Sequence, residues 1–168
     1  MARKAVTKAV ADGESVPALL QAARYWGVKI ATAESCTGGL IAGALTDVAG
    51  SSDVFERGFV TYSNAAKREM LGVRAETLEA YGAVSQQVAR EMAEGALRHS
   101  AAGMAVSVTG IAGPGGSEFK PEGRVCFGLA MRGRETLVET VEFGALGRAG
   151  VRRATVEHAL EMMMRALV

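Results

Sequence analysis

A carboxylate, a hydroxyl, a thiol and two glycines stand together in the stretch Ala33-Glu34-Ser35-Cys36-Thr37-Gly38-Gly39, between two apolar runs. A serine just past the end of a buried strand, where a helix begins, lies where open α/β sheets bind their ligands. The unpaired N–H groups of a helix start bind anions and stabilise an oxyanion on a neighbouring carbonyl. Ser35 could therefore be a nucleophile, with the amides of residues 36–39 as oxyanion donors. The alternative is that the stretch is only a capped helix start, with Ser35 or Thr37 as the cap.

A candidate base for this serine stands in the stretch Tyr62-Ser63-Asn64-Ala65-Ala66-Lys67, which follows a second strand. Lys67 falls on the first turn of a helix, where the helix dipole disfavours its protonated form, and partial burial would lower its pKa further. A neutral lysine can take a proton from a serine hydroxyl. Tyr62 could hold the lysine or donate to a substrate. The alternative for Lys67 is a solvated surface lysine.

Cys36 competes with Ser35 as nucleophile, because a thiolate is favoured near a helix start. It lacks a base, since His99 ends a helix and His158 falls inside one. Cys36 and Cys126 are therefore interpreted as small apolar residues. Their separation fits neither a disulfide framework nor a zinc site.

A glycine-rich stretch, Thr109-Gly110-Ile111-Ala112-Gly113-Pro114-Gly115-Gly116-Ser117, follows the third strand. Its composition indicates backbone amides held close to an anion, or else a flexible connection. No Gly-Lys-Ser/Thr closes it as in a P-loop, and no G-x-G-x-x-G follows the first strand, which disfavours a nicotinamide redox fold. At the start of the last helix Arg148 could bind a phosphate, whereas Arg153 is interpreted as solvated.

The elements that would position these residues alternate along the chain. Helices are expected at about 15–26, 38–47, 63–71, 85–100 and 148–167, and strands at 28–33, 55–62, 104–108, 125–131 and 136–143. Strands alternating with helices, then a hairpin and a last helix, predict a three-layer α/β/α sandwich with a mixed, mainly parallel sheet. Residues 1–14 are expected to fray and residues 15–168 to form one domain.

Composition narrows the class of protein. The 168 residues carry a formal net charge of +1 with basic residues spread along the chain, which disfavours a nucleic-acid binder. The apolar runs are shorter than the ~20 residues of a membrane span, and no signal-peptide core begins the chain. We expect a cytoplasmic protein. The Met-rich last helix is compatible with a homo-oligomer, a dimer or higher.

Together these motifs resemble the CinA C-terminal domain family of competence-damage-inducible proteins, from about residue 15 to the end. The matching stretches are TAESCTGG (32–39), DVAGSSDVFERGFVTYSNAAKREMLGV (47–73), GAVS (82–85), SVTGIAGPGG (107–116) and KPEGRV (120–125). The family's standalone members are nicotinamide-nucleotide amidohydrolases. The resemblance implies hydrolysis of nicotinamide mononucleotide to nicotinic acid mononucleotide and ammonia, without metal or cofactor.

Carried over by the resemblance, Ser35 is the nucleophile, Lys67 its base and Tyr62 an assisting residue. Thr109 and Gly110 fall in the family's second pocket motif. The residues then expected to bind the oxyanion or the substrate are Cys36, Thr37, Gly38, Gly39, Thr109, Gly110, Gly113 and Arg148.

The chain departs from the family pattern at two places. The glycine loop is one residue shorter after Pro114, and the family's Gly-Asp-Arg reads Leu146-Gly147-Arg148. Both departures fall where a substrate would be anchored. They leave two alternatives open: a non-catalytic module that binds a nucleotide or pyridine ligand, and an amidase of a different small amide.

Overall fold

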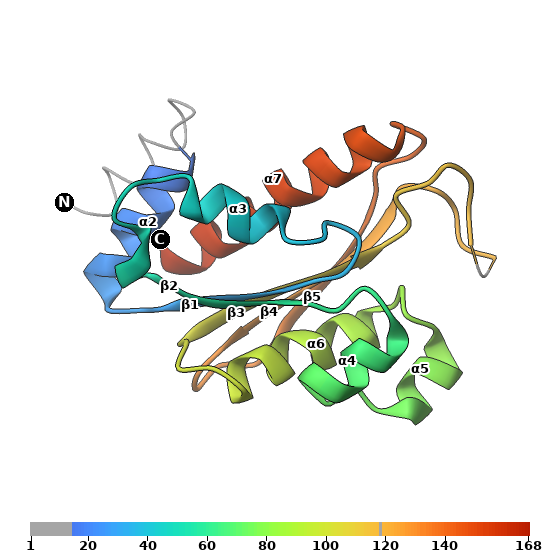
Figure 1. Ribbon diagram of the computed structural model, residues 1–168, viewed down its shortest axis with the longest axis horizontal. Coiled ribbons are helices and arrows are strands. Elements are labelled where there is room, and N and C mark those ends of the chain that lie inside the picture. The colour runs from blue at the N-terminus through green and yellow to red at the C-terminus, as the bar shows by residue number, and fades with distance from the viewer. Residues whose placement is uncertain (1–14, 118) are drawn as a thin grey trace.

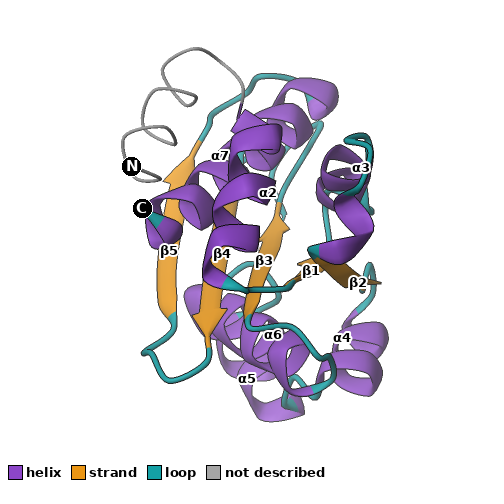
Figure 2. Ribbon diagram, turned by 90° about the vertical axis from the view of Figure 1, so that its left-hand side faces the viewer, coloured by secondary structure: helices purple, strands orange, loops and turns teal. Residues whose placement is uncertain are grey.

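The computed structural model describes residues 15–117 and 119–168. Five strands form one sheet in the order β2-β1-β3-β4-β5 (Figure 2). Their bounds are β1 Ile30–Glu34, β2 Phe55–Val60, β3 Met104–Gly110, β4 Arg124–Met131 and β5 Leu137–Glu142. β1 pairs in parallel with β2 and β3, whereas β4 pairs antiparallel with both β3 and β5. Four of these five strands therefore run in one direction, and the prediction of a mixed, mainly parallel sheet is confirmed.

Helices cover both faces of the sheet, as a three-layer sandwich requires (Figure 1). One face carries α2 (Ser15–Trp26), α3 (Leu40–Thr46) and α7 (Arg148–Leu167), and the other carries α4 (Asn64–Leu71), α5 (Ala75–Tyr81) and α6 (Gln86–Arg98). A short 3-10 turn at Ser51–Asp53 precedes β2. Ser63 and Ser85 cap α4 and α6, because each hydroxyl accepts the N–H three residues on.

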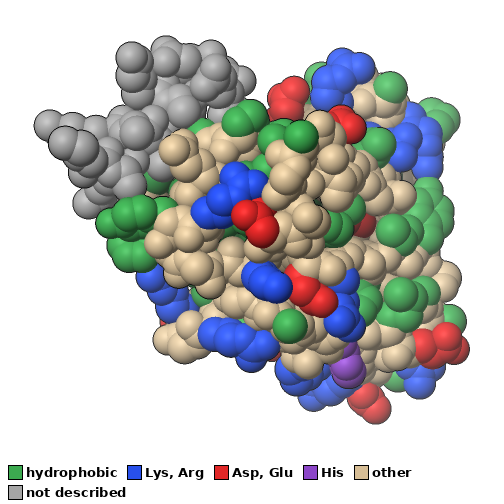
Figure 3. Space-filling view, turned by 60° about the vertical axis from the view of Figure 1, so that its left-hand side comes forward, with side chains coloured by type: hydrophobic (Ala, Val, Ile, Leu, Met, Phe, Trp, Pro, Cys, Tyr) green, Lys and Arg blue, Asp and Glu red, His purple; other side chains and the backbone are tan. Residues whose placement is uncertain are grey.

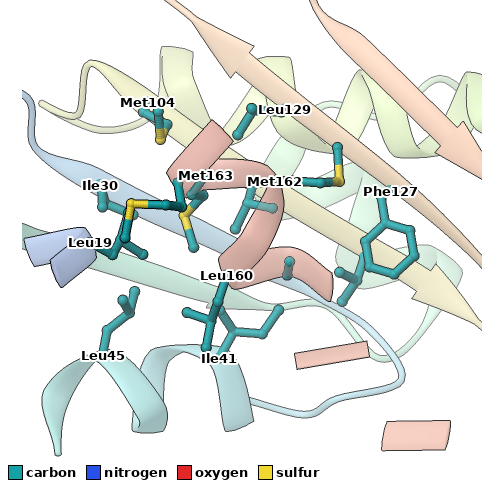
Figure 4. Close-up of a cluster of buried hydrophobic side chains, with 14 of the residues drawn as sticks. Leu19, Ile30, Ile41, Leu45, Met104, Phe127, Leu129, Leu160, Met162 and Met163 are labelled. Atoms are coloured by element: carbon teal, nitrogen blue, oxygen red, sulfur yellow. The ribbon is translucent and has the colours of Figure 1, made fainter. Parts of the chain in front are cut away.

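Each face of the sheet has its own apolar core. The larger core lies under α2, α3 and α7, and the smaller one under α4 and α6. Figure 4 shows Met162 and Met163 of α7 lying among Leu19, Met104 and Phe127. The adjoining Met164 is buried as well. The methionines of the last helix therefore pack the core of this chain, which removes them as an argument for an oligomer.

The sequence places most elements correctly and misses some details. Helix α5 was not expected, and its cap position is Arg74, whose side chain makes no capping hydrogen bond. The helix expected from residue 38 begins at Leu40, because Gly38 and Gly39 have φ angles of 57° and 105° in the left-handed region. The expectation for residues 1–14 lies outside the described residues.

The surface mixes charges of both signs. On the face drawn in Figure 3, basic side chains lie interspersed with acidic and hydrophobic ones. Among the helices described, none combines the length and apolar character needed to cross a bilayer.

Candidate active site

Ser35 and Lys67 meet at the carboxyl edge of the parallel strands. Ser35 directly follows β1, and Lys67 lies in the first turn of α4, which follows β2. The two strands are paired with Glu34 opposite Val60, so the chain leaves the sheet at the same level in both places. Lys67 Nζ lies 2.9 Å from Ser35 Oγ and donates to the carbonyl of Thr61 at 2.8 Å. The sequence-based expectation that these two groups come within hydrogen-bond reach is met.

Burial makes Lys67 easier to deprotonate than an ordinary, solvated lysine. Its side chain is only 2% exposed, and no carboxylate pairs with it among the ion pairs of the described residues. Desolvation lowers the pKa of Lys67 from 10.5 to about 8. A neutral amine can donate one N–H to Thr61 and turn its lone pair to the hydroxyl of Ser35. That is the arrangement a serine–lysine base requires.

The same burial acts in the opposite sense on Cys36. Desolvation raises the pKa of the Cys36 thiol to about 11, so the thiol keeps its proton at neutral pH. The sequence argument that a helix start would favour its thiolate is therefore wrong here. Cys36 and Cys126 are both buried and free of disulfide bonds.

The start of α3 is occupied from within the chain. The carboxylate of Glu34 is fully buried and accepts the N–H groups of Ile41 and Ala42, at 2.9 and 3.1 Å, together with the hydroxyl of Thr37. Glu34 therefore orders the turn by accepting backbone N–H groups, the role that its position just before a helix predicts; the alternative was a place near a cationic ring. The helix start itself, expected to receive an anion, already holds this carboxylate.

Not every amide of residues 36–39 is free. The N–H of Gly38 donates to the carbonyl of Ser35 at 3.1 Å. Within the described residues, the N–H groups of Cys36, Thr37 and Gly39 donate to no acceptor. Of these three residues, Cys36 lines the pocket beside Ser35, whereas Thr37 and Gly39 do not.

A pocket of about 350 Å³ opens in front of Ser35. Its wall is formed by Ser35, Cys36, Tyr62, Ala83, Val84, residues 110–117 of the glycine-rich loop, and Arg148. The guanidinium of Arg148 joins three segments, because Nη1 donates to the carbonyl of Gly113 at 2.8 Å and Nη2 donates to the Tyr62 hydroxyl at 2.7 Å. Tyr62 thus contacts Arg148 rather than Lys67, and the lysine is held by the Thr61 carbonyl instead.

Some predicted binding residues stand behind the pocket wall. Thr37, Gly38, Gly39 and Thr109 do not line it. Thr109 is buried, and its hydroxyl donates to the carbonyl of Ala83 at 2.8 Å. It therefore supports the segment that carries Ala83 and Val84. These two residues line the pocket, but they were not among the predicted binding residues, although their stretch matches the family.

Two cations that could have bound an anion are engaged elsewhere. Lys120 Nζ donates to the carbonyls of Tyr81 and Val84, at 2.7 and 2.6 Å. Arg124 pairs with Glu142 at 2.6 Å. Arg148 is the cation that lines the pocket wall.

An α/β sandwich with a buried lysine against a serine at the edge of its parallel strands defines a candidate serine–lysine hydrolase site. Residues 14–167 match the family model described as the CinA C-terminal domain. The chain belongs to this family, and the predicted resemblance is confirmed.

Curated relatives in this family are of two lengths. A CinA-like protein of Chlorobium phaeobacteroides (strain BS1) is 60% identical over 145 residues, which are 84% of this chain but 34% of that protein. The chain thus spans about a third of that relative. The nicotinamide-nucleotide amidohydrolase PncC of Enterobacter agglomerans is 51% identical over 154 residues, covering 91% of this chain and 92% of that protein. The protein of the same name from Escherichia coli (strain K12) is 52% identical over 144 residues, covering 85% and 87%.

Solved structures share the fold. The competence/damage inducible protein CihA of Agrobacterium tumefaciens superposes with a TM-score of 0.88 at 54% identity, over 92% of this chain and 93% of that one.

Proposed function

We propose that the chain is an amidohydrolase that converts nicotinamide mononucleotide to nicotinic acid mononucleotide and ammonia. The observation that carries the proposal is the 2.9 Å approach of the buried Lys67 amine to the Ser35 hydroxyl in the wall of a pocket. Support comes from relatives of nearly the same length that bear the name nicotinamide-nucleotide amidohydrolase, at 51% and 52% identity.

The first half of the mechanism forms an acyl-enzyme. Neutral Lys67 takes the hydroxyl proton of Ser35, and Oγ bonds to the carboxamide carbon. The negative charge moves to the carboxamide oxygen, which the N–H of Cys36 stabilises. The lysine ammonium then gives its proton to the amide nitrogen, the C–N bond breaks, and ammonia leaves.

The second half restores the serine. Lys67, neutral again, takes a proton from water, and the water oxygen bonds to the acyl carbon. When this tetrahedral intermediate collapses, the bond to Oγ breaks and the proton of Lys67 returns to Ser35. The net reaction consumes one water and releases one ammonia.

Arg148 is the proposed anchor for the substrate phosphate. Its hydrogen bonds to Gly113 and Tyr62 use two of the five guanidinium N–H groups, which leaves three for a phosphate. The glycine loop contributes less than its composition predicted, because the N–H of Gly115 already donates to the carboxylate of Glu122 at 3.3 Å. Arg148→Gln should therefore raise KM for the nucleotide with little change in kcat.

The decisive experiment measures ammonia released from nicotinamide mononucleotide by wild type, Ser35→Ala and Lys67→Met. We expect release by wild type and a loss of several powers of ten in both variants. Normal release by Ser35→Ala would refute the mechanism. Thermal stabilisation of wild type by the nucleotide without any ammonia would favour a binding module instead. If ammonia is released from another small amide but not from nicotinamide mononucleotide, the chain is an amidase of a different substrate. The shortened glycine loop and the altered residues before Arg148 would then be the determinants of that substrate.

Cellular location and assembly belong to the proposal. We place the enzyme in the cytoplasm, consistent with two free buried cysteines. A homo-oligomer, a dimer or higher, remains part of the hypothesis and is measured directly by light scattering.

A further inference from the structure

Arg152 reaches the serine turn from the far end of the chain. It lies on α7, four residues after Arg148, and its side chain is partly buried against the turn formed by residues 35–39. Nε donates to the carbonyl of Cys36 at 3.2 Å, and Nη2 donates to the carbonyl of Thr37 at 3.3 Å. Arg152 does not line the pocket. Whatever it does for the reaction, it does through the backbone of the turn.

The two carbonyls that Arg152 holds determine where the neighbouring N–H groups point. In a planar trans peptide, the C=O and the following N–H point in opposite directions. Residues 35–39 contain no cis peptide bond. Holding the Thr37 carbonyl toward α7 therefore turns the N–H of Gly38 the other way, where it meets the carbonyl of Ser35 at 3.1 Å.

That second contact fixes the peptide that carries the oxyanion donor. Because the Ser35 carbonyl faces Gly38, the N–H of Cys36 must face away from Gly38. The orientation of the Cys36 N–H thus depends on two peptide planes, Ser35–Cys36 and Thr37–Gly38, the second of which is held by the Arg152 guanidinium. Glu34 fixes the opposite end of the turn, through the hydroxyl of Thr37 and the first amides of α3.

We propose that Arg152 is a positioning residue that orients the Cys36 N–H toward the developing oxyanion. The proposal rests on the acyl-transfer function proposed for Ser35. It differs from a purely structural role, in which Arg152 would only attach α7 to the turn and its loss would lower stability without a specific effect on the chemical step.

The first test separates kcat from KM. Arg152→Met keeps the length of the side chain and removes its donors. We expect kcat for ammonia release to fall about 30- to 100-fold, because a misdirected oxyanion donor loses much of its effect, while KM changes by less than about threefold. Arg153→Met, on the exposed neighbouring residue of the same helix, is the matched control and should retain wild-type kcat. Retention of kcat within about threefold in Arg152→Met would overturn the proposal.

Chemical rescue distinguishes positioning from stability. Methylguanidine at millimolar concentration should restore part of the kcat of Arg152→Ala, whose short side chain leaves room for it, without raising its melting temperature, and should leave Ser35→Ala inactive. Arg152→Lys should be intermediate, because an ammonium cannot hold two carbonyls in the geometry of a planar guanidinium. If kcat falls among the Arg152 variants in proportion to their melting temperature, and methylguanidine does not restore it, the role of Arg152 is structural and the proposal is overturned.

A probe that is independent of the nucleotide separates the failure of this proposal from failure of the proposed function. A fluorophosphonate phosphonylates Ser35: Oγ bonds to phosphorus, fluoride leaves, and Lys67 takes the hydroxyl proton. The rate of labelling is measured by intact mass. If wild type is labelled but releases no ammonia, the proposed substrate is wrong. The labelling rate then still tests whether Arg152 positions the oxyanion donor. Labelling at least about tenfold slower in Arg152→Met supports positioning, and equal rates refute it. If wild type is neither labelled nor able to release ammonia, both proposals are overturned.

Discussion

Raising the pH should raise kcat/KM for ammonia release until Lys67 has lost its proton. The burial that lowers the pKa of this lysine to about 8 sets the size of the effect. At pH 7 about one-tenth of such amines are neutral, against about three in ten thousand for a lysine that titrates at 10.5, a gain of about 300-fold in active enzyme. From pH 7 to pH 9 the neutral fraction should then rise about tenfold and level off.

The assay follows ammonia at low substrate concentration between pH 7 and 10, above the range in which a phosphate monoester titrates near pH 6. A blank without enzyme at each pH corrects for spontaneous hydrolysis. Lys67→Arg is the control, because a guanidinium stays protonated throughout and should give no activity at any pH. A rate that climbs about 100-fold from pH 7 to pH 9 and continues through pH 10 would show an ordinary lysine and refute the reasoning, as would a flat profile.

Three further predictions concern stability, each measured by urea unfolding. Unfolded Lys67 keeps its proton up to pH 10.5 while the folded residue releases it near 8, so wild-type stability should rise with pH across this window by up to about 3 kcal/mol, and Lys67→Met should lack that rise. Glu34→Gln should lower the free energy of unfolding by about 2–3 kcal/mol, because an amide cannot accept all the hydrogen bonds of the buried carboxylate; a loss below about 0.5 kcal/mol would contradict the role given to it. Gly95→Ala should cost at least about 2 kcal/mol, since the new methyl group would collide with the Leu71 carbonyl, whereas Gly43→Ala, with open space around it, should gain about 0.5–1 kcal/mol; equal effects of the two would refute the close approach of α6 to α4.

The approach of Ser35 to Lys67 could be predicted from sequence because both follow neighbouring parallel strands. Such strands end at one edge of a sheet, so residues just beyond them meet even when 32 positions apart. Strand pattern and cap residues were enough to anticipate the three layers. The family was evident from the motifs.

The hydrogen-bond and ion-pair partners of long polar side chains could not be predicted, because each such side chain has several possible partners in the folded chain. The position of Glu34 before a helix favours a carboxylate that orders the turn, but local sequence does not show which N–H groups it accepts. Lys120 is held by two backbone carbonyls and Arg124 by Glu142, and neither pairing can be inferred from their positions in the sequence. Arg152 contacts Cys36 across 116 positions, and that pairing is determined by how α7 docks on the folded sheet. Helix α5 lacks a capping side chain and so gave no start signal.

The position of α7 bears on how the protein is made. Ser35 is synthesised early. Arg148 and Arg152, which contact Tyr62 and Cys36 near the serine, are synthesised only with α7. A nascent chain, or a product cut short before that helix, holds the nucleophile and its lysine without the residues that complete their surroundings. Hydrolysis should therefore begin only after α7 has been synthesised and has docked on the sheet.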